Sequence, residues 1–186
     1  MRVIAGKVKG HRLKYVSNTR LRPTSDIIKG AIFSCLDSME LDYARVLDLY
    51  AGTGALGIEA LSRGADWVDF VERDPKACEI IKDNLVHTKL SEQAHIYRST
   101  VKKTLSFLKG KYMLILMDPP YADTTTSDIL QILADSPIVG EGSVIVAEHA
   151  DKKPLQSVYG CFEQIKNLNH GDTNVSIYQY TAGGQS

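Results

Sequence analysis

Apolar and polar positions change their spacing in a regular order along most of the chain. From residue 45 onward, short apolar runs are followed by longer segments in which apolar residues recur every three or four positions. Short apolar runs are typical of buried parallel strands, and the longer period is typical of helices packed on a sheet. This order predicts an α/β fold with a doubly wound, mostly parallel sheet and helices on both faces. We expect strands at 46–50, 67–72, 94–99, 112–117 and 143–148, and helices at 55–63, 75–88, 101–108 and in a segment ending near Pro137.

Further elements are predicted on both sides of this alternating region. Before it, Ile28, Ile32 and Leu36 share one face of a predicted helix that ends near Met39, so Cys35 on that face is expected in the core. After it, residues 153–159 are expected to form a weak helix. The segments 161–168 and 174–180 then alternate apolar and polar residues around a turn, which predicts a closing antiparallel hairpin.

The first residues form a separate unit in the pattern. Residues 2–5 and 12–16 are short extended stretches divided by Gly6 and Gly10, which predicts a small β-hairpin. A two-stranded hairpin is barely stable alone, so it must pack against the main domain. We therefore divide the chain into a β-hairpin arm, residues 1–22, and a main domain, residues 23–186.

Charge gives this arm a possible role. The 186 residues contain 22 Lys and Arg and 22 Asp and Glu, yet residues 1–22 contain no acidic residue. Segregated positive charge favours a polyanionic partner such as RNA, although a solvated basic hairpin would look the same. The candidate RNA contacts are Lys7, Lys9, Arg12, Arg20 and Arg22, with Thr24 where the arm joins the main domain.

Other features of the composition limit the class of protein. No apolar run approaches the length of a transmembrane helix, and the N-terminus lacks the apolar segment of a signal peptide. The three cysteines are far apart and form no metal-binding or disulfide pattern. We expect a cytoplasmic monomer with no membrane partner and no metal.

The strongest local signal is the segment 46–57, a short strand followed by a glycine-rich turn and a helix start. Gly52, Gly54 and Gly57 have the G-x-G-x-x-G spacing of nucleotide-binding turns. Glycine permits positive φ and close approach of a ligand, and the helix start offers unpaired N–H groups. A tight turn without a ligand is the simpler alternative. The candidate cofactor contacts here are Asp48, Tyr50, Ala51, Gly52, Thr53 and Gly54.

A doubly wound sheet binds its ligands at the carboxyl ends of the strands, which adds Glu72 to this site. Glu72 ends the second predicted strand, and a carboxylate there can accept both hydroxyl groups of a ribose. Arg73 and Ser99, at the ends of neighbouring strands, are candidate contacts to the adenine. NAD and S-adenosylmethionine both carry this ribose, so dehydrogenase and methyltransferase remain open.

The segment Asp118-Pro119-Pro120-Tyr121 favours a methyltransferase. It follows the buried strand 112–117, and two successive prolines stiffen the turn and remove two N–H donors. The Asp118 carboxylate and the Pro119 carbonyl can accept both hydrogens of an exocyclic amine, and Tyr121 can stack on the base. A purely structural turn is the alternative. All four residues are candidate catalytic residues.

Together these motifs resemble a known family, the bacterial 16S ribosomal RNA (guanine-N2)-methyltransferases. The resemblance covers nearly the whole chain, and its most specific part is the basic arm with R-P-T, residues 22–24. It implies a Rossmann-like class I fold that uses S-adenosylmethionine. It also implies methylation of a guanine N2 in 16S ribosomal RNA, with the small ribosomal subunit or its assembly intermediate as partner. The chain departs from the family at Tyr50 and Thr53, where Phe and Ser are more frequent, and at Arg98-Ser99-Thr100, where an acidic or amide group is frequent.

Three alternatives remain open at this point. An adenine-N6 methyltransferase of RNA or DNA would use the same four residues, although the chain is short for a separate DNA-recognition domain. An NAD-dependent oxidoreductase would explain the glycine turn and Glu72 but leaves Asp118–Tyr121 without a role. A catalytically idle RNA-binding module would explain the basic arm alone.

Overall fold

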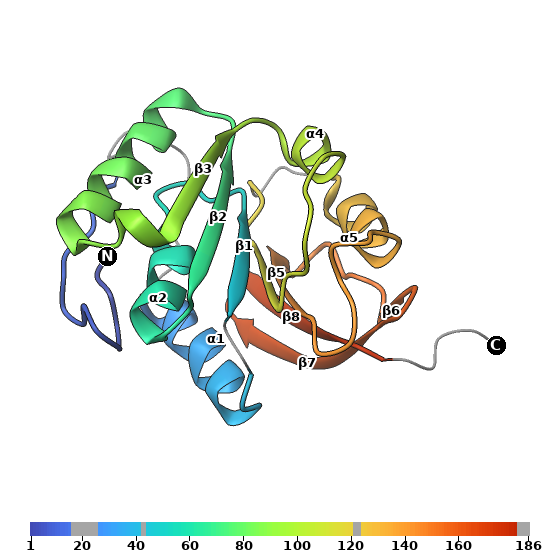
Figure 1. The fold of residues 1–186 in the computed structure, drawn as a ribbon. Helices are drawn as coiled ribbons and strands as arrows, with labels where there is room; N and C mark the ends of the chain where they lie inside the picture. Colours follow the sequence, from blue (N-terminus) through green and yellow to red (C-terminus); the bar gives the residue numbers. More distant parts are fainter. Residues whose placement is uncertain (16–25, 42–43, 121–123, 182–186) are drawn as a thin grey trace.

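The computed structural model describes residues 1–15, 26–41, 44–120 and 124–181, and these residues form a layered α/β structure around one sheet (Figure 1). The sheet is eight-stranded, in the order β3-β2-β1-β4-β5-β8-β7-β6. Its strands are β1 (Arg45–Leu49), β2 (Trp67–Glu72), β3 (Ala94–Arg98), β4 (Leu114–Met117), β5 (Val144–Ala150), β6 (Val158–Tyr159), β7 (Phe162–His170) and β8 (Thr173–Tyr180).

Strands β1 to β5 are parallel, and β8, β7 and β6 continue the sheet in antiparallel order. The predicted doubly wound, mostly parallel sheet is therefore confirmed. The chain order reverses between β1 and β4, because β2 and β3 lie on one side of β1 and β4 and β5 on the other. The crevice at the carboxyl ends of β1 and β4 is the place where such sheets bind ligands.

Helices cover both faces of the sheet (Figure 1). On one face α1, α2 and α3 pack over a core that includes Phe33, Phe70 and Leu116, and on the other α4 and α5 pack over Ile115, Ile129 and other buried residues. The helices are α1 (Asp26–Ser38), α2 (Ala55–Arg63), α3 (Pro75–Thr88), α4 (Val101–Leu105) and α5 (Thr126–Ala134). Cys35 is buried in the first of these cores, as predicted.

Most predicted elements are present, but the prediction of a helix at 153–159 is wrong. This segment begins in a turn and ends in the short strand β6, which pairs with β7. Pro154 disfavours helical backbone at Lys153. The backbone N–H of Gln156 donates to the Tyr159 hydroxyl at 3.1 Å, so it is not used in a helical hydrogen bond.

The N-terminal arm is less regular than predicted, and it is firmly attached. Its two stretches form one isolated antiparallel bridge, between Arg2 and Arg12. Val3 and Leu13 are buried in the core under α1 and α2. Since these two side chains take the apolar positions of the hairpin, its basic side chains are left on the outside.

A buried ion pair holds the start of the arm. Lys29 of α1 and Glu59 of α2 are both fully buried and lie 3.5 Å apart. Glu59 accepts the backbone N–H groups of Ile4 and Ala5 at 2.8 and 3.0 Å, and Lys29 donates to the Arg2 carbonyl at 2.6 Å. Burial lowers the pKa of Lys29, while the Glu59 carboxylate opposes that shift. The arm thus supplies partners that a buried charge pair needs.

Asn84 of α3 holds the end of the arm and connects it to the glycine loop. Its side chain accepts the Lys14 N–H at 2.8 Å and donates to the Lys14 carbonyl at 3.1 Å. It also donates to the carbonyl of Thr53 at 3.0 Å. One fully buried amide therefore contacts both segments.

Four predicted site residues lie outside the described ranges. They are Arg20, Arg22 and Thr24, predicted to contact RNA, and Tyr121, predicted to be catalytic. Within the described ranges, no helix has the length and apolar character needed to cross a membrane.

Candidate functional site

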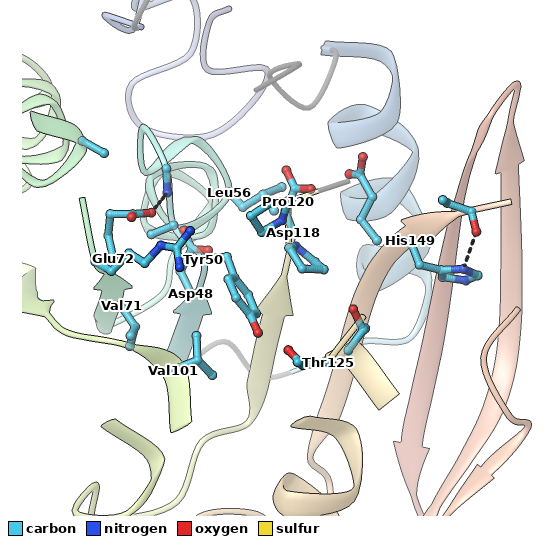
Figure 2. A pocket seen from close by; sticks show the side chains of 18 of the residues that line it. Asp48, Tyr50, Leu56, Val71, Glu72, Val101, Asp118, Pro120, Thr125 and His149 are labelled. Atoms are coloured by element: carbon cyan, nitrogen blue, oxygen red, sulfur yellow. Dashed lines mark hydrogen bonds between the residues drawn. The ribbon is translucent and has the colours of Figure 1, made fainter. Parts of the chain in front are cut away.

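A cavity of about 1250 Å³ opens at the carboxyl ends of β1, β2, β4 and β5. Figure 2 shows Glu72 and Asp48 on one side of it, Asp118 and Pro120 in the middle, and His149 on the other side. Eight of the predicted cofactor contacts line the cavity: Asp48, Tyr50, Ala51, Gly52, Thr53, Glu72, Arg73 and Ser99.

The backbone of the glycine loop has the left-handed conformation that its sequence predicts. Gly52 and Gly54 have φ of 55° and 77°, and Tyr50 adopts φ of 59°, which is uncommon for a residue with a side chain. The Gly52 N–H donates to a Glu72 carboxylate oxygen at 2.9 Å (Figure 2), and the Asp74 N–H donates to the other at 2.8 Å. Glu72 is therefore fixed in place, with lone pairs left for a ligand.

The third glycine of the motif serves packing. Gly57 lies in α2, and its N–H donates to Asp48 Oδ2 at 2.9 Å. A Cβ at Gly57 would collide with the Phe70 ring and lie 2.9 Å from the same carboxylate oxygen. Only glycine therefore lets α2 approach β1 and β2 this closely.

Gly54 is the predicted cofactor contact that the structure does not bring to the cavity. It is the N-cap of α2, and a Cβ there would lie 3.2 Å from Ile81 and 3.3 Å from Phe70. The side of Gly54 on which a Cβ would stand therefore faces the core between α3 and β2. The positive φ, rather than a ligand, accounts for glycine at this position.

Four carboxylates end up on one face of four neighbouring strands. Asp48 is paired with Phe70 on β2 and Leu116 on β4, and Leu116 is paired with Val146 on β5. Side chains two residues apart on a strand share a face. The positions two residues beyond these partners are those of Glu72, Asp118 and Glu148, all of which line the cavity.

Burial and the neighbouring negative charges both raise the pKa of the Asp48 carboxyl group. Burial raises its pKa well above the usual range, the Gly57 N–H opposes the shift, and the negative charges of Asp118 and Glu72 add to it. The cavity therefore favours a ligand that brings positive charge to this carboxylate row, which we define as Glu72, Asp48, Asp118 and Glu148.

The segment after β4 lies at the centre of the cavity. Asp118, Pro119 and Pro120 all line it. The Asp118 N–H contacts the Leu49 carbonyl at 3.5 Å, so the alignment of β4 with β1 continues to this residue. The sequence therefore brings the predicted acceptors of an exocyclic amine into the same cavity as the glycine loop.

Several lining residues were missed from the sequence. Met1 and Tyr15 come from the arm and Ile28 from α1, and they reach the cavity because of tertiary packing that has no local sequence signal. Glu148 is the last residue of the strand predicted at 143–148, so the rule that selected Glu72 could have found it. Thr124 to Ser127, His149, Asp172 and Thr173 line the side of the cavity away from the glycine loop.

His149 shapes the wall on that side. Its Nδ1 lies 3.2 Å from the Ala150 carbonyl and 3.0 Å from the Lys153 carbonyl, so Nδ1 carries a hydrogen. Its Nε2 lies 2.9 Å from the hydroxyl of Ser176 on β8. The ring therefore links the loop after β5 to strand β8, and His149 has a structural role here.

The basic residues of the arm lie outside the cavity. Lys7, Lys9 and Arg12 are exposed, and none of them lines it. Tyr15, at the end of the same arm, is 56% exposed and does line it. The arm therefore carries exposed positive charge on a segment that leads to the cavity.

The fold and the cavity together define the class of protein. A parallel sheet continued by an antiparallel hairpin, with a carboxylate-lined crevice at the switch point, is the architecture of the class I methyltransferases, and the protein is an enzyme of this class. The chain belongs to the family described as Conserved hypothetical protein 95, whose model matches residues 1–179. This match includes the arm as well as the main domain.

Individual relatives agree with this assignment. YlbH of Bacillus subtilis is 37% identical over 182 residues, covering 96% of this chain and 98% of that protein. Ribosomal RNA small subunit methyltransferase D of Haemophilus influenzae is 32% identical over 185 residues, covering 96% and 93%. The solved structure of yhhF from Escherichia coli superposes with a TM-score of 0.86 at 25% identity, covering 98% of each chain.

One similar structure contains a ligand. It is an RNA methyltransferase from Salinibacter ruber in complex with S-adenosyl-L-homocysteine, with a TM-score of 0.65 and 14% identity, covering 86% of this chain and 94% of that one. At this identity the similarity concerns the fold alone.

Proposed function

We propose that the protein transfers a methyl group from S-adenosylmethionine to the exocyclic N2 amine of a guanine in 16S ribosomal RNA. The observation that carries the proposal is the meeting of Asp118-Pro119-Pro120 with Glu72 and the glycine loop in one cavity. The names of the relatives, small-subunit ribosomal RNA methyltransferases, support the same class of substrate.

The residues of the cavity fit S-adenosylmethionine. Glu72, held by two backbone N–H groups, presents its remaining lone pairs to the hydroxyls of a ribose. Arg73 and Ser99 border the space beside it, where an adenine would lie. The end of the carboxylate row at the glycine loop, formed by Glu72 and Asp48, suits a ligand with a positive sulfonium. The cofactor supplies an electrophilic methyl group.

Asp118 and Pro119 would position the acceptor. The Asp118 carboxylate and the Pro119 carbonyl each accept one N–H of the amine, which directs the nitrogen lone pair into the cavity. The guanine must leave its stack to reach this point, at a cost of a few kcal/mol. Asp118 need not be a strong base, because the amine proton becomes acidic once the nitrogen is alkylated. Most of the catalysis then comes from position and electrostatics.

The arm would bind the RNA. The side chains of Lys7, Lys9 and Arg12 are exposed on a segment whose last described residue, Tyr15, lines the cavity. Phosphate contacts of this kind position a substrate without selecting its sequence. Arg20, Arg22 and Thr24 are proposed to extend this surface. A cytoplasmic monomer that acts on the small subunit or its assembly intermediate completes the proposal.

Methylation of adenine N6 is the competing function, since the same acceptors suit either amine. Small subunits that lack the modification should accept labelled methyl groups from S-adenosylmethionine, and the product should map to a guanine N2. Label on an adenine N6 would replace the guanine assignment. Absence of transfer, together with tight binding of NAD and none of S-adenosylmethionine, would refute the methyltransferase.

A further inference from the structure

Asp118 and Pro119 bind an exocyclic amine, but they do not distinguish guanine from adenine. The two bases differ at the ring nitrogen beside the amine. Guanine has an N1–H donor next to its N2 amine, whereas adenine has an N1 lone pair next to its N6 amine. A site that selects guanine therefore needs a second hydrogen-bond acceptor beside the one that holds the amine.

Glu148 is placed where this second acceptor is needed. It lies near the carboxyl end of β5, the strand that pairs with β4 through Met117 and Ala147. Asp118 and Glu148 each follow directly in that register. Neighbouring strands are about 4.8 Å apart, so two side chains at this register lie within reach of the two adjacent donors of one base edge.

The other carboxylates of the row are already assigned by their contacts. Asp48 accepts the Gly57 N–H, and Glu72 accepts those of Gly52 and Asp74. In the strand order β2-β1-β4-β5, both lie on the glycine-loop side of Asp118. Glu148 lies on the opposite side, toward the wall formed by Thr124–Ser127 and Thr173.

A neighbouring polar group does not compete with it for this role. The ring of His149 is held by two carbonyls and by Ser176, so both of its nitrogens are used. Ile28 of α1 contributes an apolar surface to the same cavity. Ile28, Asp118 and the half-buried Glu148 therefore all line the cavity that a base edge would enter.

We propose that Glu148 accepts the N1–H of the target guanine and thereby selects guanine over adenine. The inference rests on the proposed function and adds a residue to it. An ionised carboxylate has acceptors and no donor, so it would bind the guanine edge and repel the N1 lone pair of adenine. Asp118 thus holds the reacting amine, and Glu148 determines which base offers it.

A pair of substrates, used together with a variant of Glu148, tests this contact. Small subunits are reconstituted with 16S RNA that carries either guanine or 2-aminopurine at the mapped position. Both bases have the 2-amine, but 2-aminopurine lacks the N1–H and also the 6-carbonyl, so the response of the preference to a change at Glu148 identifies the N1–H contact. The wild-type enzyme should prefer guanine by about 100-fold in kcat/KM, because a site that accepts the N1–H disfavours an analogue that lacks this donor.

Glu148→Gln should reduce that preference to about tenfold or less, because the amide can also donate to the N1 lone pair of 2-aminopurine. Binding of S-adenosylmethionine, measured by calorimetry, should stay unchanged and shows that the variant is folded. Glu163→Gln, the same change at an exposed position on β7, is the matched control and should keep the wild-type preference.

The outcomes separate the two proposals. Equal use of both substrates by the wild-type enzyme overturns the role of Glu148 while leaving guanine methylation in place, and so does a preference that Glu148→Gln leaves unchanged. Failure of the wild-type enzyme to methylate the guanine at all overturns the proposed function and this inference with it.

Discussion

Asp48 combines two functions at the scale of one residue. Its carboxylate is buried, it accepts the N–H of Gly57, and it faces the negative charges of Asp118 and Glu72. Burial of a charge without a counterion is unfavourable, so the folded protein favours the protonated form. The same residue that ties α2 to β1 therefore also reduces stability at neutral pH.

The raised pKa of Asp48 predicts a specific pH dependence of stability. Between the unfolded value of 3.8 and the raised pKa, the folded state binds more protons than the unfolded state. The free energy of unfolding should therefore be greatest below this window and fall as the pH rises through it, by up to about 1.4 kcal/mol per pH unit. Asp48→Asn keeps an oxygen for Gly57 and removes the titration. Urea unfolding from pH 4 to 8 should give a flatter curve for the variant; parallel curves would contradict the prediction.

Asp118 should matter for turnover and little for cofactor binding. Asp118→Ala removes the acceptor of one amine hydrogen and should lower kcat by about 100- to 1000-fold, the effect of losing one preorganised polar group. Calorimetry should give an affinity for S-adenosylmethionine close to that of the wild type. Asp66→Ala, at an exposed position outside the cavity, is the control. Near-normal turnover in Asp118→Ala would exclude the proposed role.

At the scale of elements, the β1-α2-β2 unit shows which parts of the glycine motif the sequence can predict. Strand β2 and helices α2 and α3 have the predicted bounds, because each apolar run ends at a clear signal, such as Gly64 after α2 or Pro75 at the start of α3. The pattern could not separate Gly52 at the cavity from Gly54 and Gly57, which face the core. All three glycines belong to one motif, and only their tertiary neighbours differ.

Gly57 should therefore be sensitive to the smallest side chain. Gly57→Ala places a methyl group against the Phe70 ring and the Asp48 carboxylate, and should lower the free energy of unfolding by about 1–3 kcal/mol. Gly30→Ala in α1 is a matched control, because a Cβ there meets nothing within 4 Å. That change should raise stability by about 0.4–1 kcal/mol. Chemical unfolding measures both; equal effects would show that the packing at Gly57 is not limiting.

At the scale of the whole molecule, charge and cavity are arranged around the docked arm. The sequence predicted that the arm is basic and that it packs on the main domain. It did not predict that Met1 and Tyr15 would line the cavity, because no local pattern encodes the contacts of Val3, Leu13 and Asn84 with distant helices. Glu148 was missed although it ends a predicted strand, because no glycine or proline motif accompanies that strand end.

Reversal of the arm charges should weaken RNA binding in a salt-dependent manner. A variant with Lys7, Lys9 and Arg12 changed to Glu removes up to three phosphate contacts, each of which contributes about 0.7 to 0.9 to the slope of log K against log salt. The control changes Lys103, Lys109 and Lys166, which are exposed outside the cavity and the arm. Filter binding from low to moderate salt measures both slopes. An unchanged slope in the arm variant would leave the arm as a solvated hairpin.

The side chain of Asn84 has one more consequence. It holds the Lys14 backbone at one end and the Thr53 carbonyl of the glycine loop at the other. A ligand that orders either segment removes conformational freedom that the other ligand would otherwise have to remove. By reciprocity, whatever factor RNA contributes to the affinity for the cofactor, the cofactor contributes to the affinity for RNA. One buried amide thus connects the segment proposed to bind RNA with the loop proposed to bind the cofactor.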